Sequence, residues 1–166
     1  MSASTYEFPE MQPQQRLQEL ILYIADRLQG DPAFGKVKLA KILYFIDFTS
    51  YRLYKKPVTG AAYIRLPHGP VPQPYFDILD EMQANGYIAI REEAVFDYNQ
   101  QRIMAIRRAD VKLFSGRDIQ LVEDVIRHLR GKTPSNSVNY RMELPGDSPI
   151  LTKKSPMRPA CYLMSR

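Results

Sequence analysis

The apolar positions along the first third of the chain recur with helical spacing. Leucine and isoleucine side chains form one stripe over residues 15–28, and Gly30 and Pro32 follow as stop signals, which predicts a helix. A longer helix is predicted over residues 35–54. It has two apolar stripes. One contains Leu39, Ile42, Leu43, Ile46 and Leu53, and the other contains Tyr44, Phe48 and Tyr51. A helix that is apolar on two sides packs on two sides, so we expect this helix to be the central element.

After residue 60 the segments with regular apolar spacing become shorter, and predicted strands are interspersed with predicted helices. It predicts one strand at 61–66, a helix at 74–85, two antiparallel strands at 87–96 and 102–107, and a helix that starts near Ser115. We interpret residues 97–101 as the hairpin loop, and we expect Asp118 to complete the cap at Ser115. Thr133 and Pro134 predict the start of a short fifth helix. The fold class is therefore α+β and mainly helical, with a compact domain, a short strand, a β-hairpin and a winged-helix-like element order.

Length and local composition suggest how the chain is divided. A chain of 166 residues is suited to one domain with a sizeable core. Residues 1–14 are rich in Ser, Pro and Gln and are expected to form a flexible leader. Residues 15–143 are expected to form the globular domain, and residues 144–166 a Pro-rich C-terminal tail.

The overall composition is that of an ordinary globular protein. Hydrophobic residues make up 45% and charged residues 25% of the chain, and no apolar run is long enough to span a bilayer. The first residues lack the pattern of a signal peptide, and the single cysteine, Cys161, excludes an intrachain disulfide. We therefore expect a cytoplasmic protein without a membrane partner. The net charge of +5 is spread along the chain, which favours a solvated basic surface over a nucleic-acid footprint.

Two features of residues 36–80 are not needed simply to bury a core. Asp47 lies among apolar neighbours in the central helix, and the segment Leu66–Pro72 contains a stiff His68-Gly69-Pro70 sequence. A buried carboxylate needs hydrogen-bond donors, which His68 and the backbone N–H groups of the following loop are expected to supply. We favour a structural role in which Asp47 fastens the loop to the central helix over a catalytic role.

The side chains that carry common enzyme chemistry are sparse. His68 and His128 are the only histidines, and no acids stand at ligand spacing, so no metal site is predicted. Signatures of nucleophilic hydrolases are absent, and Pro70 removes an N–H that a phosphate-binding loop would need. We therefore predict neither an enzyme nor a bound cofactor.

A winged-helix order makes DNA binding an alternative function. The helix that would enter the major groove lies within residues 73–86, which contain Asp77, Asp80 and Glu81 and neither Lys nor Arg. Phosphates would be repelled by that face, so nucleic-acid binding is disfavoured. Tyrosines near the central motif, Tyr63 and Tyr75 among them, are expected to pack in the core, or to anchor a protein partner if they are exposed together.

Three motifs in order resemble those of the Panacea domain of SocA-like antitoxins. They are the helix KLAKILYFID from Lys38 to Asp47, the turn PVTG from Pro57 to Gly60, and the segment from Tyr63 to Pro72 that ends in GPVP. The resemblance implies an antitoxin that neutralises a cognate protein toxin by direct contact. It also implies diverse toxin partners, and the family occurs in phage-associated proteins as well.

The resemblance leaves the mode of action open. Some family members are proteolytic adaptors that deliver the toxin to a Clp-type protease, which is an alternative to occlusion by binding. We predict that Asp47 anchors the loop and that Tyr63, His68 and Tyr75 lie close to it. With Gly69 and Pro70, these residues form the predicted partner-binding site; the oligomeric state is not predicted.

Overall fold

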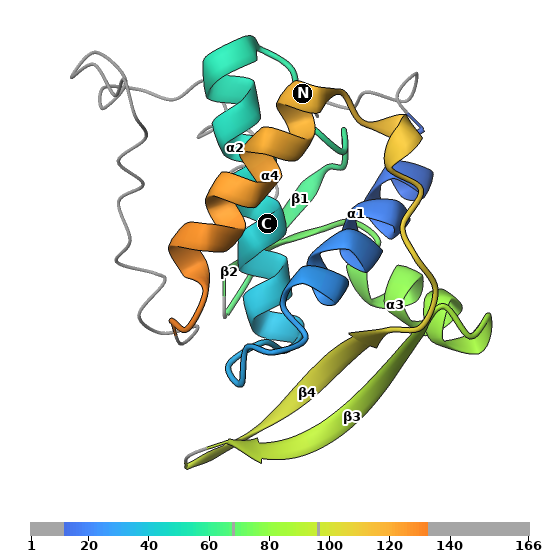
Figure 1. The fold of residues 1–166 in the computed structure, drawn as a ribbon. Coiled ribbons are helices and arrows are strands. Elements are labelled where there is room, and N and C mark those ends of the chain that lie inside the picture. Colours follow the sequence, from blue (N-terminus) through green and yellow to red (C-terminus); the bar gives the residue numbers. More distant parts are fainter. Residues whose placement is uncertain (1–11, 68, 96, 133–166) are drawn as a thin grey trace, which may run out of the picture.

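The structure is a computed structural model that describes residues 12–67, 69–95 and 97–132. This part of the chain forms four α-helices and two antiparallel two-stranded sheets (Figure 1). In chain order they are α1 (Pro13–Arg27), α2 (Lys36–Tyr54), β1 (Tyr63–Leu66), β2 (Gly69–Pro72), α3 (Tyr75–Ala84), β3 (Ile88–Val95), β4 (Tyr98–Ala105), a 3₁₀ turn η2 (Val111–Leu113) and α4 (Gly116–Leu129). This arrangement confirms the predicted compact, mainly helical α+β fold.

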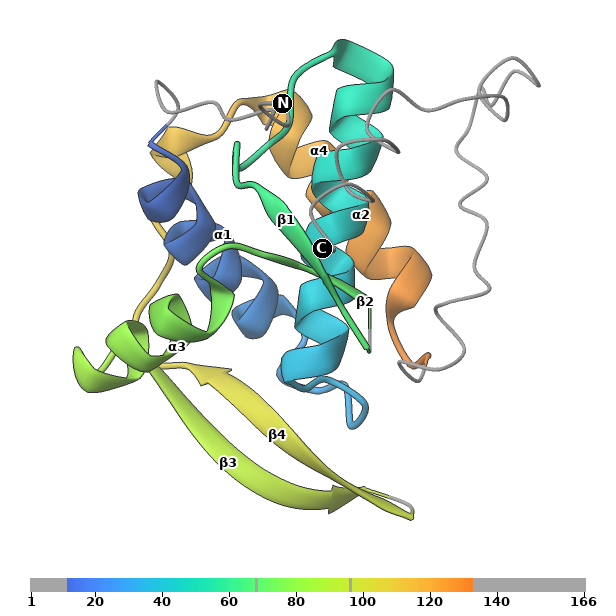
Figure 2. The same cartoon turned by 180° about the vertical axis from the view of Figure 1, so that it is seen from behind.

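Helix α2 is the central element, as its two apolar stripes predict. It contacts α1, α4, β2 and β4, and both ribbon views show it alongside α4 with the β1–β2 hairpin lying against it (Figures 1 and 2). Leu39, Ile42, Leu43 and Ile46 have no exposed surface. Leu53 was expected to join them, but it is 39% exposed because the last turn of α2 extends past the core.

The β1–β2 hairpin corrects the prediction of a single strand followed by a stiff loop. Residues 69–72 pair with 63–66 in an antiparallel register that matches Ile64 with Val71. The N–H of Gln73 donates to the carbonyl of Ala62 at 2.7 Å, and hydrogen-bonded pairs alternate along such a ladder. Pro70 and Pro72 therefore occupy positions whose N–H would point away from β1. Proline is tolerated at such positions. Because prolines usually argue against a strand, their presence kept the sequence analysis from predicting β2.

The β3–β4 hairpin projects from the helical body in both ribbon views (Figures 1 and 2). The prediction of a loop at 97–101 was wrong, because β4 already begins at Tyr98, which pairs with Val95. The polar residues of this segment belong to the strand and hold it to the chain between α1 and α2. The amide of Gln100 donates to the carbonyl of Pro32 at 2.5 Å, and the Arg102 guanidinium donates to the carbonyl of Asp31 at 2.9 Å.

The first and last helices of the described chain can be compared with the predicted start of the domain and the predicted helix cap. Helix α1 begins at Pro13, within the expected leader. At α4 the Ser115 hydroxyl accepts the N–H of Asp118 and the Asp118 carboxylate accepts the N–H of Ser115, which confirms the predicted cap. The expected fifth helix at Thr133 and the Pro-rich tail lie outside the described residues.

A buried ion pair joins the α1–α2 loop, the start of α2 and the chain just after α4. The Lys38 ammonium lies 2.6 Å from the Asp31 carboxylate and 2.7 Å from the carbonyl of Lys132, and both charged side chains are 1% exposed. Asp31 also accepts the N–H groups of Ala33 and Gly131. Burial alone would raise the pKa of Asp31, but the hydrogen bonds from Lys38 and these two N–H groups outweigh it and lower the pKa. The start of α2 and the end of α4 therefore share one electrostatic contact.

Replacement of Lys38 tests this contact. Lys38→Met keeps the volume of the side chain but leaves Asp31 as a buried charge without its cation, so we expect the free energy of unfolding to fall by about 3–5 kcal/mol. Arg127→Ala is the matched control, because Arg127 belongs to an ion pair in which it is 72% exposed, and it should cost less than about 1 kcal/mol. Urea denaturation measures both values. Equal losses in the two variants would contradict the role given to the buried pair.

Candidate functional site

The carboxyl group of Asp47 is fully buried and lies at the centre of a hydrogen-bond network. One oxygen accepts the N–H of Val58 at 2.8 Å and the N–H of Thr59 at 2.7 Å. The other oxygen contacts the Thr59 hydroxyl and lies 2.7 Å from the Tyr63 hydroxyl. The network fastens the segment between α2 and β1 to the side of α2.

The predicted anchor at Asp47 therefore exists, but it holds a different segment from the one expected. The donors come from the turn before β1, and not from the loop at the tip of the β1–β2 hairpin. The turn can form because Gly60 adopts φ 79°, which a residue with a side chain rarely does, and because Thr59 Oγ1 accepts the N–H of Ala61. The predicted contact with His68 falls outside the described residues.

The contacts around Tyr63 favour a protonated Asp47. The single hydroxyl hydrogen of Tyr63 faces two acceptors, Asp47 at 2.7 Å and the carbonyl of Leu43 at 2.9 Å. A proton on the Asp47 carboxyl lets that acid donate to Tyr63 while Tyr63 donates to Leu43. Burial also raises the pKa of Asp47, although the hydrogen bonds that Thr59 and Val58 donate to the carboxyl oppose this rise. A carboxyl group held on all sides in this way is a structural group.

The aromatic side chains around this network are part of the packing. Tyr63 is 3% exposed, and its ring meets the ring of Tyr44 edge-on with centroids 5.6 Å apart. Tyr44 stacks on Phe48 at 5.5 Å. Tyr63 therefore supports the site from inside and offers almost no surface to a partner.

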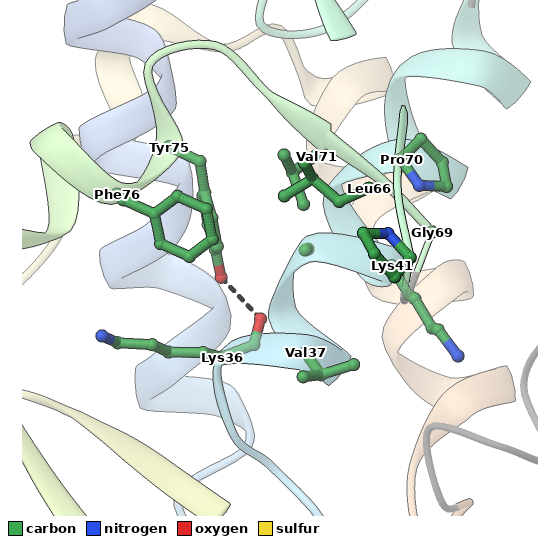
Figure 3. Close-up of a pocket in the computed structure, with 11 residues that line it drawn as sticks. Lys36, Val37, Lys41, Leu66, Gly69, Pro70, Val71, Tyr75 and Phe76 are labelled. Carbon is green, nitrogen blue, oxygen red and sulfur yellow. Dashed lines mark hydrogen bonds between the residues drawn. The ribbon is translucent and has the colours of Figure 1, made fainter. Parts of the chain in front are cut away.

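A small open pocket lies where α2, the β1–β2 hairpin and α3 meet (Figure 3). Its volume is about 130 Å³. The lining is apolar apart from two lysines and the Tyr75 hydroxyl, and consists of Lys36, Val37, Ala40, Lys41, Leu66, Pro67, Gly69, Pro70, Val71, Tyr75 and Phe76. Two of these residues stand out because they are large, apolar and exposed: Val37 at 40% and Phe76 at 49%.

Three of the predicted site residues lie in this pocket. Gly69 and Pro70 come from the start of β2, and Gly69 has φ +120°, which a side chain would strain. The Tyr75 hydroxyl donates to the carbonyl of Lys36 at 2.6 Å and so joins the start of α3 to the start of α2 (Figure 3). This bond holds Tyr75 at the start of α2, beside the loop residues Gly69 and Pro70, whereas Tyr63 bonds to Asp47 further along the helix. The predicted site therefore divides into a buried anchor (Asp47 and Tyr63) and a surface pocket.

Sequence reasoning missed the rim of the pocket, namely the half-buried Lys36 and the exposed Val37 and Phe76. One signal was present for Phe76. The apolar stripe of α3 runs through Tyr75, Ile78, Leu79 and Met82, all buried. Phe76 lies off that stripe, and a large aromatic residue off the buried face of a helix is a candidate for binding.

No other chemistry is apparent among the residues that the structure describes. In residues 12–67, 69–95 and 97–132, no three side chains of His, Cys, Asp or Glu gather in a way that could hold a metal ion. Across the same ranges, no helix combines the length and apolar character needed to cross a membrane.

The comparison with protein families agrees with this fold and with the motifs that build the pocket. The family model described as antitoxin SocA-like, Panacea domain, matches residues 39–144, which is more than half of the chain. The protein belongs to this family, which supports an antitoxin role in general and a role other than catalysis. No match was found among curated proteins or among solved structures.

Substitutions of Asp47 separate a neutral anchor from an ionised one. Asp47→Asn keeps an acceptor for the N–H groups of Val58 and Thr59 and a donor for Tyr63, and it loses only the acceptor of the Thr59 hydroxyl, so it should cost about 1 kcal/mol. Asp47→Ala leaves two buried N–H groups without acceptors and should cost about 3 kcal/mol. Thermal or urea unfolding of both variants at one pH measures the difference, and equal costs would contradict the hydrogen-bond argument.

The pH dependence of stability tests the protonation state directly. Because the folded-state pKa of Asp47 lies above the ordinary 3.8, the folded protein keeps a proton that the unfolded chain has lost. Wild-type stability relative to Asp47→Asn should therefore fall as pH rises above 3.8 and level off beyond the folded-state pKa. Urea denaturation of both proteins from pH 4 upward provides the measurement. A wild type that gains stability over the variant in this range would show that the buried carboxyl is ionised.

Proposed function

We propose that this protein neutralises a cognate protein toxin by binding it directly, through the surface around the pocket of α2, β1–β2 and α3. The observation that carries the proposal is the open apolar pocket with Val37 and Phe76 exposed at its rim. Apolar side chains exposed together beside a concavity are typical of protein-binding surfaces. All lining residues except Lys36 and Val37 fall within the family match.

The rigidity of the pocket suits it to binding. Pro67 and Pro70 restrict the backbone of the hairpin, and the Tyr75–Lys36 hydrogen bond holds α3 against α2. A surface that is already ordered loses little conformational entropy when a partner binds. The toxin would be met where it is synthesised, so the proposed compartment of action is the cytoplasm.

Two alternatives make different predictions. A proteolytic adaptor would lose its protective effect in cells that lack the protease, and it need not form a stable complex with the toxin. A DNA-binding regulator would bind its own promoter with marked salt dependence. The described structure gives little support to the second alternative, because Asp77, Asp80 and Glu81 are all exposed on α3, the helix that would enter the groove.

Co-expression with the product of the neighbouring gene tests the proposal. We expect that product to stop growth when it is expressed alone, and this protein to restore growth and to copurify with it. Restored growth without a stable complex would favour the adaptor. A neighbouring product that is harmless and does not bind would contradict the antitoxin proposal.

A pair of exposed aromatic residues makes the test specific to the pocket. Phe76→Ser removes an exposed ring from the rim and should weaken toxin binding at least about tenfold, with little change in the melting temperature. Tyr98→Ser is the matched control, because Tyr98 is 39% exposed on the β3–β4 hairpin and does not line the pocket. Calorimetric titration measures both affinities. Equal affinities for the two variants would place the toxin-binding surface elsewhere.

A further inference from the structure

The size of the pocket limits what it can hold. Pockets for small-molecule ligands usually measure about 300–1,000 Å³, whereas this one measures about 130 Å³. That volume suits a single bulky side chain. Binding hot spots of protein interfaces are commonly built in this way, with one anchor residue in a desolvated pocket.

The interior of the pocket selects an apolar side chain. Ala40 and Val71 contribute buried apolar surface to it, and Leu66 and Pro70 contribute further apolar atoms. The one hydroxyl at its edge, that of Tyr75, already donates to the carbonyl of Lys36 (Figure 3). A polar group placed inside would lose water without gaining a matched partner, which is costly.

The charged side chains that line the pocket are of one sign. Lys36 and Lys41 extend to opposite sides of it (Figure 3), and none of the eleven residues that line it is acidic. Lys41 is only 8% exposed, and burial lowers the pKa of its ammonium because the charged form is poorly solvated there. Lys36 is half-buried and more accessible, so a carboxylate brought beside it would be favoured by the positive field at this side of the pocket.

We propose that the pocket receives one apolar side chain from a short acidic segment of the toxin, with a carboxylate of that segment next to Lys36. This inference rests on the proposed function and specifies the chemistry of the contact. The anchor supplies most of the affinity through apolar burial, and the carboxylate supplies orientation and a faster, salt-dependent association.

Two substitutions in the full-length protein test the anchor and the charge separately, with the toxin that restores growth as the probe. Ala40→Leu fills the pocket from α2 and should weaken binding at least about tenfold, whereas Ala84→Leu, on an exposed position at the end of α3, should have no effect.

Lys36→Glu should weaken binding about five- to tenfold at low salt. That loss should shrink at 1 M salt, where the Debye length is about 3 Å. Lys112→Glu, an exposed lysine of η2, is the charge control.

A photo-crosslink identifies the occupant without relying on loss of binding. The photoreactive residue p-benzoylphenylalanine in place of the exposed Val37 should crosslink to a toxin peptide that contains a large apolar residue within two positions of Asp or Glu. Replacement of that acid by Lys in the toxin should restore affinity to the Lys36→Glu variant. A crosslinked peptide without such residues, or a charge exchange that restores nothing, would overturn the inference.

The failure of this inference and the failure of the proposed function give different results. If the wild-type protein neither binds the toxin nor restores growth, the proposed function fails, and the inference fails with it. If the wild type binds and protects while Ala40→Leu and Lys36→Glu bind as tightly as their controls, the antitoxin role stands and the pocket is not its anchor site. Melting temperatures of all four variants show whether a lost affinity reflects a lost fold.

Discussion

The hydrogen bonds to the buried carboxyl of Asp47 determine where the chain goes after α2. Without them, the backbone N–H groups of Val58 and Thr59 would be buried with no acceptor, and the turn before β1 would have no reason to lie against the helix. The direction of that turn sets the start of β1, and β1 sets the register of β2. The tip of the hairpin, which forms one wall of the pocket, is therefore positioned by a residue that does not touch the pocket.

The opposite end of α2 is fixed by two independent contacts. The Tyr75 hydroxyl holds the start of α3 to the carbonyl of Lys36, and the Lys38–Asp31 pair ties the next residues to the end of α4. Side chains at 36, 37 and 40 therefore belong to a helix that is restrained on its two flanks. A concave surface built on such a support keeps its shape when it is empty, which reduces the entropy lost on binding.

The sequence predicted what periodicity and local rules control. The helices follow from apolar spacing and from caps such as Ser115 with Asp118, and the central place of α2 follows from its two stripes. The β2 strand was missed because Pro70 and Pro72 argue against a strand unless their N–H positions are known to point outward. Residues 98–101 were read as a loop because polar side chains there bond to a segment almost seventy residues away, as Gln100 does with Pro32. No local pattern contains that information.

At the candidate site, too, local sequence predicted the anchor residue but not the distant residues that it contacts. An acid at position 47 of an apolar helix predicts an anchor, but the identity of its donors depends on the path of the turn, and Tyr75 reaches α2 at Lys36. The residues that hold the pocket together are buried, and substitutions there cost stability. The rim residues Val37 and Phe76 are largely exposed, so their substitution costs little. The rim can therefore be altered by substitution while the anchor at Asp47 keeps the pocket in place.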